Sequence, residues 1–220
     1  MSKKRVVITG LGIVAPNGVG LTAFTHAIKN GISGITHDAE LKRLQFSCQI
    51  AGKPIITEEL KRDYFTELEL RNFNSSGILY GVIAGIEAWK NAGLPIQNNE
   101  NPDWDSGTIF GSGTSGIEKF RESIYKIDDF QTRKLGSTVV AQTMNSGISA
   151  YLAGKLGLGN QVSTNSSACT TGTESILMGY DRIISGQANR MLVGSTSDSG
   201  PYIWAGFDAM KVCTFKHNES

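Results

Sequence analysis

One stretch of the sequence, residues 163–173, has the residue types of a nucleophilic site. It reads S-T-N-S-S-A-C-T-T-G-T, and the apolar residues after it recur at steps of three and four up to about residue 185. That recurrence is helical, so Cys169 is expected at or just before a helix N-terminus. The free N–H groups and the helix dipole there favour a thiolate. The same N–H groups can hold the oxyanion that forms when a thiolate attacks a thioester.

The alternative for Cys169 is a buried structural cysteine, because a free cysteine often behaves as a small hydrophobic residue. The context decides between the two. Glycines precede a short strand expected over 161–164, and a tight turn, the cysteine and a helix follow it. This order is typical of a nucleophile. Small neighbours such as Ser166, Ser167 and Gly172 also let a substrate approach closely. The sequence therefore predicts that Cys169 is catalytic.

The remaining cysteines and histidines do not form a second site. The sequence has three cysteines, Cys48, Cys169 and Cys213, which is an odd number, and no C-x-x-C pair. This pattern argues against a disulfide framework and against a metal site. The pattern fits a reducing compartment with a free thiol. His26 falls in an expected helix and His37 in an expected loop. Both are interpreted as structural.

The glycines near the start of the chain do not predict a nucleotide cofactor. Gly10 and Gly12 begin a G-x-G pattern, but Ala15 stands where the dinucleotide fingerprint needs its last glycine. No G-x-x-x-x-G-K-[ST] phosphate loop occurs either. These glycines are interpreted as backbone geometry, and no cofactor is expected.

The elements that must position Cys169 alternate between strands and helices, which indicates an α/β fold in one domain over 1–220. Buried strands are expected at 5–9, 108–112, 161–164 and 190–195, with a further strand possible at 46–50. Helices are expected at 22–29, 57–62, 71–91, 117–126, 139–156 and 172–185. Residues 128–136 look irregular, and residues 197–220 have no periodicity and suit a loop that covers a pocket.

Composition excludes several functional classes. The 220 residues are 40% hydrophobic with a formal net charge of +1, so no bulk attraction to nucleic acid or to a membrane surface is expected. No apolar run approaches the roughly 20 residues that span a bilayer. The apolar run at residues 6–8 is also too short for the core of a signal peptide. The expected location is the cytoplasm.

Several motifs, in order along the chain, resemble those of one family. Residues 166–172, S-S-A-C-T-T-G, resemble the nucleophile motif of the β-ketoacyl-acyl-carrier-protein synthases. Residues 5–12 resemble the opening strand and turn of these enzymes, and residues 31–35 resemble their next turn. G-S-G-T-S-G at 111–116 resembles their glycine loop, and F-D-A-M at 207–210 a segment at their active-site entrance. Together these motifs are most similar to the elongating type I/II branch.

The resemblance implies the N-terminal half of a thiolase-like fold, a mixed β-sheet between helices, with cap loops. It implies decarboxylative Claisen condensation, in which Cys169 takes an acyl group from a carrier-protein thioester and a malonyl thioester supplies the carbanion. The implied partners are acyl-carrier protein, acyl and malonyl thioesters, and a second subunit in a homodimer or heterodimer. Thr114 would face the acyl pocket, where relatives carry a bulky aliphatic residue or glycine, and Phe207 would line the entrance.

The resemblance also implies that this chain alone is inactive. In the family, two histidines and one oxyanion-hole N–H come from the second half, and that half is absent from these 220 residues. His217 is the one histidine after Cys169 and matches neither histidine motif. Three alternatives remain open: a thiolase-type acyltransferase, a non-catalytic subunit similar to a chain-length factor, and a stand-alone cysteine hydrolase.

Overall fold

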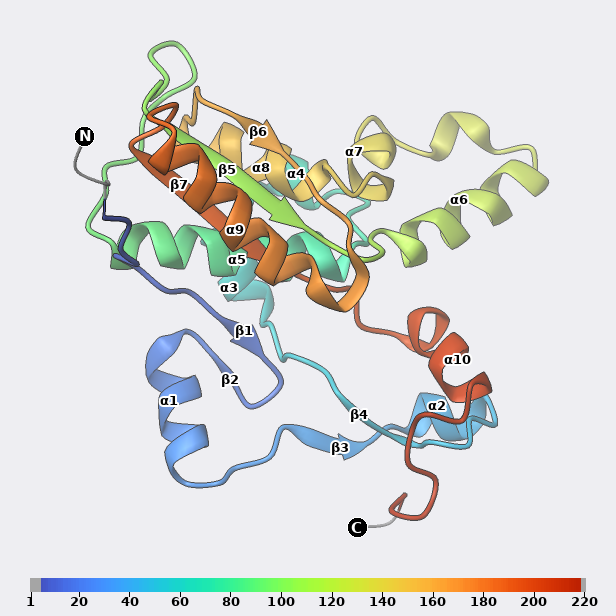
Figure 1. The fold of residues 1–220 in the computed structure, drawn as a ribbon. Coiled ribbons are helices and arrows are strands. Elements are labelled where there is room, and N and C mark those ends of the chain that lie inside the picture. Colours follow the sequence, from blue (N-terminus) through green and yellow to red (C-terminus); the bar gives the residue numbers. More distant parts are fainter. Residues whose placement is uncertain (1–4, 219–220) are drawn as a thin grey trace.

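The computed structural model describes residues 5–218 and has a three-stranded sheet at its centre (Figure 1). The strand order is β6 (Val162–Ser163), β5 (Ser106–Gly111), β7 (Arg190–Ser195), and both pairs of strands are parallel. β5 pairs with β7 along its full length, in a register that places Thr108 opposite Leu192. β7 is therefore an edge strand of this sheet, as is β6.

Helices cover both faces of the sheet. α5 (Ser76–Asn91) and α8 (Gly147–Leu156) pack on one face, where Phe110 and Leu192 join the hydrophobic core. α9 (Thr171–Ile184) packs on the other face, and Gly179 lets it approach the side chain of Val193 closely. The core lies between α5, α8 and the sheet, and consists of fully or largely buried residues that include Ile78, Val82, Ile83, Ile86, Ile148, Leu152 and Leu156.

The smaller elements surround this body. Before α5 come β1 (Val14–Ala15), β2 (Gly18–Val19), α1 (Leu21–Lys29), β3 (Ile35–His37), α2 (Ala39–Arg43), β4 (Ile50–Gly52), α3 (Glu58–Arg62) and α4 (Glu67–Leu70). α6 (Ile117–Asp128) and α7 (Val139–Thr143) lie between β5 and α8, and α10 (Pro201–Ala209) follows β7. β1 pairs with β2 and β3 with β4, both antiparallel. The β3–β4 pair, α2 and α10 lie together, away from the central sheet (Figure 1).

The prediction of a buried strand at residues 5–9 is wrong. These residues are not in any strand, and Val7 and Ile8 are 60% and 78% exposed. The segment is held against α5 instead: a Cβ at Gly10 or Gly12 would lie within 2.3 Å of a backbone oxygen of that helix. In the described part of the chain, no strand lies beside it to accept its backbone hydrogen bonds.

Four other expectations differ from the structure at element boundaries. The helix expected at 71–91 begins at Ser76, because Asn72 has a positive φ of 57°. The helix expected at 139–156 is two helices, because Met144 is extended between them. The strand expected at 46–50 starts only at Ile50, since the N–H groups of Ser47 and Cys48 donate to Asp208 instead of to a strand.

The fourth concerns the region expected to be a loop at 197–220, which contains α10. Pro201 stands in the first turn of this helix, where its missing N–H costs nothing. In addition, His37 lies in β3 and not in a loop, and a short 3₁₀ turn, Thr132–Lys134, occupies part of the irregular stretch 128–136. The expected helices at 22–29, 57–62, 117–126 and 172–185 and the strands at 108–112, 161–164 and 190–195 are confirmed to within a few residues.

Candidate active site around Cys169

Cys169 lies in an exposed turn between the sheet and α9. The chain leaves β6 at Ser163, passes through a 3₁₀ turn at Ala168–Thr170 and enters α9 at Thr171. Of the three free cysteines, Cys169 is the exposed one, whereas Cys48 is buried. This order of strand, turn, thiol and helix is the one that the residue spacing predicts, and it resembles a nucleophile elbow in outline.

The residue before Cys169 has an unusual backbone conformation. Ala168 has a φ of 51°, which a residue with a Cβ adopts at a cost of about 1–2 kcal/mol. Hydrogen bonds hold the turn in place: the hydroxyl of Thr171 donates to the carbonyl of Ala168 at 2.7 Å and accepts from the N–H of Ser167 at 3.0 Å. The hydroxyl of Thr170 also donates to the carbonyl of Ser167 at 2.7 Å. Such local strain is often found at functional turns.

Asn165 ties the end of β6 to the first turns of α9. Its amide donates to the carbonyl of Thr171 at 2.9 Å, and its carbonyl oxygen accepts from the buried hydroxyl of Ser175 at 2.7 Å. Further back, the hydroxyl of Ser149 on α8 donates to the Ser163 carbonyl at 2.7 Å. Cys169 is therefore carried by a turn that is bonded to the helices on both faces of the sheet.

The glycine loop at 111–116 lies beside this turn. The hydroxyl of Ser166 donates to the carbonyl of Gly113 at 3.2 Å, and a Cβ placed on Gly113 would be 3.6 Å from the Cα of Ala168. Within the loop, the hydroxyl of Ser112 donates to the carbonyl of Thr114 at 2.6 Å. Thr114, the residue of this loop expected to face the acyl pocket, is exposed.

Asp198 fixes the far end of the glycine loop, and sequence reasoning missed it. Its carboxylate is 3% exposed and accepts the N–H of Gly77 at 2.7 Å and that of Ile117 at 3.0 Å. One buried carboxylate therefore caps the first turns of both α5 and α6. No local pattern around S-D-S-G-P predicts this, because the two N–H groups lie 121 and 81 residues away in sequence.

Phe207 does not join the site around Cys169. It lies in α10 and lines a separate cavity of about 230 Å³ together with Cys48, Cys213 and Trp204. That cavity includes neither Thr114 nor Cys169. Asp208, next to Phe207, ties this helix to the loop before β4 by accepting the N–H groups of Ser47 and Cys48, each at 2.9 Å.

Two ionisable groups near α10 have shifted pKa values. Burial raises the pKa of the Glu118 carboxyl, and the nearby carboxylates of Glu40 and Asp198 add to this, whereas Arg121 opposes it. Burial also raises the pKa of the Cys213 thiol, with smaller contributions from Cys48 and Asp208. Cys213 is therefore less readily converted to a thiolate than an ordinary cysteine.

Comparison with known proteins assigns the chain to a family. The family described as "Beta-ketoacyl synthase, N-terminal domain" matches residues 3–220. This chain belongs to the β-ketoacyl synthase family. It is 30% identical over 220 residues to 3-oxoacyl-[acyl-carrier-protein] synthase 2 of Vibrio cholerae, covering 100% of this chain and 52% of that protein. It is 32% identical to synthase 1 of Buchnera aphidicola, covering 99% and 53% of the two chains.

Solved structures of ketosynthases have the same fold. A β-ketoacyl synthase from Burkholderia phymatum superposes with a TM-score of 0.82 at 23% identity, covering 98% of this chain and 52% of that one. The type II polyketide ketosynthase of the AntDE:AntF complex, which is bound to its acyl-carrier protein, superposes with a TM-score of 0.80 at 22% identity, covering 100% and 52%. The ketosynthases establish the thiolase-like fold predicted from the motifs, and the chain spans about half the length of these relatives.

Within the described residues 5–218, no group of three or more histidine, cysteine, aspartate or glutamate side chains is arranged to bind a metal ion. The same residues contain no helix that is long and apolar enough to cross a membrane.

Proposed function

We propose that residues 1–220 form the N-terminal domain of a β-ketoacyl-acyl-carrier-protein synthase and supply its nucleophile, Cys169. The observation that carries this proposal is the environment of the thiol. Cys169 is exposed at a strained turn that hydrogen bonds hold between a buried sheet and α9. A structural cysteine has no need of such a turn, whereas a thiol that must meet a bulky thioester does.

In the proposed first step, the Cys169 thiolate attacks the thioester carbonyl of an acyl-carrier protein. The new S–C bond forms as the C–S bond to the carrier's phosphopantetheine breaks, and the carrier leaves as a thiolate that takes up a proton. In the second step a malonyl thioester loses CO₂, and the resulting carbanion attacks the acyl-Cys169 carbonyl. The C–S bond to Cys169 breaks, which regenerates the thiolate and releases a β-ketoacyl-carrier protein. This is covalent catalysis by an activated nucleophile.

The proposal places the other essential groups outside these 220 residues. His26 lies in α1, where its ring nitrogen is 3.3 Å from the side-chain amide of Asn30, and His37 lies in β3. Neither is on the turn, the glycine loop or α9. A proton-transfer group contributes about 10²–10⁴-fold to a rate, and an oxyanion donor about 10²–10³-fold. The chain alone is therefore expected to be acylated but not to condense.

The exposed apolar surface of α9 supports the proposal that a partner polypeptide packs on this domain. Ile176, Leu177 and Tyr180 are all exposed on this helix, directly after the turn that holds Cys169. A cluster of large exposed apolar side chains beside a proposed active site is typical of a protein interface. We infer that the second half of the synthase, and a further subunit in a homodimer or heterodimer, pack on this domain.

Substrate selection is assigned to Thr114 and Phe207. Thr114 is exposed on the loop that lies against the Cys169 turn, so it is the nearer of the two to the proposed acyl group. Phe207 is half-exposed on α10 and lies in the apolar cavity with Cys48 and Cys213. It can reach the acyl chain only if the segment that carries α10 packs against the second half of the synthase. Its role is therefore proposed for the complete enzyme.

A second candidate is a non-catalytic subunit similar to a chain-length factor. The chain superposes on the ishigamide ketosynthase/chain length factor with a TM-score of 0.79 at 20% identity, and a chain-length-factor-like subunit is expected to share this fold. The cysteine at position 169 favours the catalytic role. A thiolase-type acyltransferase remains a third candidate, and a cysteine hydrolase a fourth.

Mass spectrometry of the chain after incubation with an acyl-acyl-carrier protein separates these candidates. A stable acyl adduct on Cys169 supports the synthase, and no adduct supports the chain-length-factor role. Release of free acid without an adduct supports a hydrolase. Cys169→Ala should abolish the adduct, and Cys213→Ala is the matched control that should keep it. Adduct formation that survives Cys169→Ala would refute the assignment.

A further inference from the structure

Two thiols outside the site around Cys169 line one small cavity. Cys48 lies in the loop before β4, and Cys213 follows α10. Both line the apolar cavity of about 230 Å³ that also includes Phe207. A cavity of this size holds only a few water molecules, because one water occupies about 30 Å³. The two thiols are therefore close in space, although they are far apart in the sequence.

The electrostatics of Cys213 support this closeness. Burial is the main cause of the raised pKa of the Cys213 thiol, and Cys48 is the next, ahead of the Asp208 carboxylate. A charge raises the pKa of a neighbouring thiol in this way only from a short distance. Cys48 therefore lies near Cys213 as well as in the same cavity.

Cys48 is the fixed member of this pair. Its side chain is buried, and its N–H donates to the carboxylate of Asp208 at 2.9 Å. Its thiol donates to the carbonyl of Ile50 at 3.5 Å. An S–H group is a weak hydrogen-bond donor, so little is lost when this sulfur forms another bond.

Cys213 lies in a loop that is attached to the Cys48 segment at both of its ends. At one end, Asp208 accepts two N–H groups of residues 47–49, each at 2.9 Å. At the other end, the side chain of Asn218 accepts a third N–H group of the same segment at 2.8 Å. The loop between these two anchors cannot move far away, so the concentration of the Cys213 thiol around Cys48 is high.

The two thiols differ in their access to solvent. Cys213 is partly exposed, Cys48 is buried, and both are free thiols in the structure. A small oxidant therefore meets Cys213 first, and Cys48 is the neighbouring thiol that can react next. An accessible thiol beside a second, resolving thiol is the arrangement found in reversible redox sites.

We propose that Cys48 and Cys213 form a reversible dithiol–disulfide site that low-molecular-weight disulfides, such as oxidised glutathione, convert to a disulfide. In the first step, the Cys213 thiolate attacks one sulfur of the small disulfide. Its S–S bond breaks, and the leaving thiolate takes up the proton that Cys213 lost. In the second step, the Cys48 thiolate attacks the Cys213 sulfur and releases the second small thiol, which takes up the proton of Cys48. The protein loses two electrons, and one small disulfide is reduced to two thiols.

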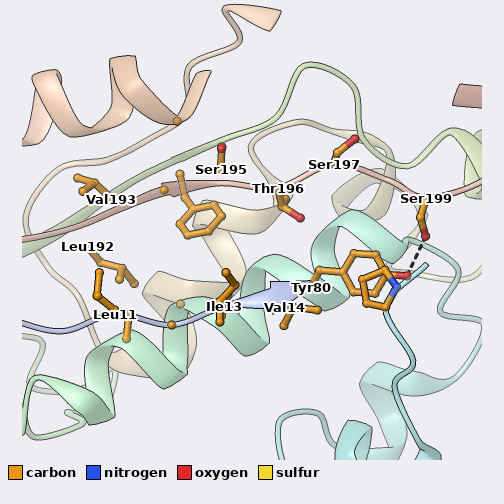
Figure 2. Close-up of a pocket in the computed structure, with 18 of the residues that line it drawn as sticks. Leu11, Ile13, Val14, Tyr80, Leu192, Val193, Ser195, Thr196, Ser197 and Ser199 are labelled. Atoms are coloured by element: carbon orange, nitrogen blue, oxygen red, sulfur yellow. Dashed lines mark hydrogen bonds between the residues drawn. The ribbon is translucent and has the colours of Figure 1, made fainter. Parts of the chain in front are cut away.

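The disulfide would fasten the C-terminal end of α10. The other end of this helix is already attached to α5, because the hydroxyl of Ser199 lies 2.8 Å from that of Tyr80 (Figure 2) and its N–H donates to Ser76 at 2.9 Å. At the C-terminal end, one of the two hydrogen bonds of Asp208 is exposed. A covalent bond there holds Phe207 at the cavity wall. Its effect on substrate selection rests on the proposed function, whereas the disulfide itself does not.

Peptide mapping of the full chain carrying Cys169→Ala tests the proposal. This variant keeps Cys48 and Cys213 as its two thiols and lacks the proposed nucleophile, so the result is independent of the proposed function. After incubation with oxidised glutathione, the peptide of Cys48 should be linked to that of Cys213, and dithiothreitol should reverse the link. The linked fraction should stay the same when the protein is diluted about tenfold, because the reaction is intramolecular. A lasting glutathione adduct on Cys213, a disulfide between two copies or two unmodified thiols would overturn the proposal.

Two further measurements test the order of reaction and the effect on α10. Adding Cys213→Ser, a substitution at a partly exposed position, should slow the oxidation of Cys48 at least about tenfold, since Cys48 is buried. Oxidation of Cys48 at an unchanged rate would refute the role of Cys213 as the first thiol. The oxidised Cys169→Ala chain should melt about 10 °C higher than the reduced one, because the disulfide closes a long loop. A disulfide form that melts no higher would refute the fastening of α10.

Discussion

Replacing the buried Asp198 by alanine should destabilise the domain more than the matched loss of Asp208. The side chain is buried and accepts two N–H groups, from Gly77 at 2.7 Å and Ile117 at 3.0 Å. Each belongs to the first turn of a helix, where no intrahelical acceptor exists. Losing one cap costs about 1–2 kcal/mol, and a hydrogen bond to a charged group is worth about 1.5–3 kcal/mol. The expected loss is about 3 kcal/mol.

Asp208→Ala is the matched control. Asp208 also accepts two N–H groups, from Ser47 and Cys48, each at 2.9 Å. The first of these bonds is exposed, so water can replace the lost acceptor, and the expected cost is about 1 kcal/mol. Asp198→Asn should lie between the two alanine variants, because the amide oxygen keeps one acceptor while its NH₂ group faces the second N–H.

The assay is urea unfolding followed by circular dichroism, together with thermal melts. For a domain of this length, 3 kcal/mol corresponds to a fall in Tm of about 6–12 °C. The m-values should stay equal, which ensures that the midpoints report stability. If Asp198→Ala and Asp208→Ala cost the same, or if Asp198→Ala costs less than about 1 kcal/mol, then the double cap does not contribute what the geometry implies.

Three further predictions concern thiols, pH and specificity. A brief pulse of iodoacetamide should label Cys169 first, because it is exposed, whereas Cys48 is buried and the pKa of Cys213 is raised by burial; earlier labelling of Cys48 or Cys213 would contradict this. Glu118→Gln should raise Tm at pH 7–8, and this gain should vanish below about pH 4. The reason is that the pKa of Glu118 is raised in the folded state, so its ionisation destabilises the folded domain as the pH rises above about 4. The gain should stay below about 1 kcal/mol, since Glu118 is partly exposed, and a gain that persists at pH 3.5 would refute the cause. In a complete enzyme, Thr114→Ile should shift acyl-chain preference toward shorter chains, and an unchanged preference in competition assays would remove Thr114 from the pocket.

The parts of the fold that the sequence predicts are those specified by local patterns. α9 follows from apolar residues at helical spacing, and the turn before it from a run of small residues, so the position of Cys169 could be derived without a structure. β7 is a continuous apolar run with β5 beside it, and it forms where expected. Asp198 could not be derived, because a residue that caps two helices through N–H groups 121 and 81 positions away leaves no periodic signal. The helix α10 was missed because its apolar residues at 202–205 are consecutive and hide the helical spacing of Ile203 and Phe207, although Pro201 is a valid start signal.

The failure at residues 5–9 has a different cause, and it is the more informative one. R-V-V-I-T has the composition of a buried strand just as R-M-L-V-G-S at 190–195 does. The second run forms a strand because β5 lies within hydrogen-bonding distance of it along its whole length, whereas the first has a cavity where its neighbour should be. Strand propensity expresses fit to a pleated, paired surface and not an intrinsic state of the backbone. A run with the composition of an inner strand that is left in solvent therefore marks where pairing is missing.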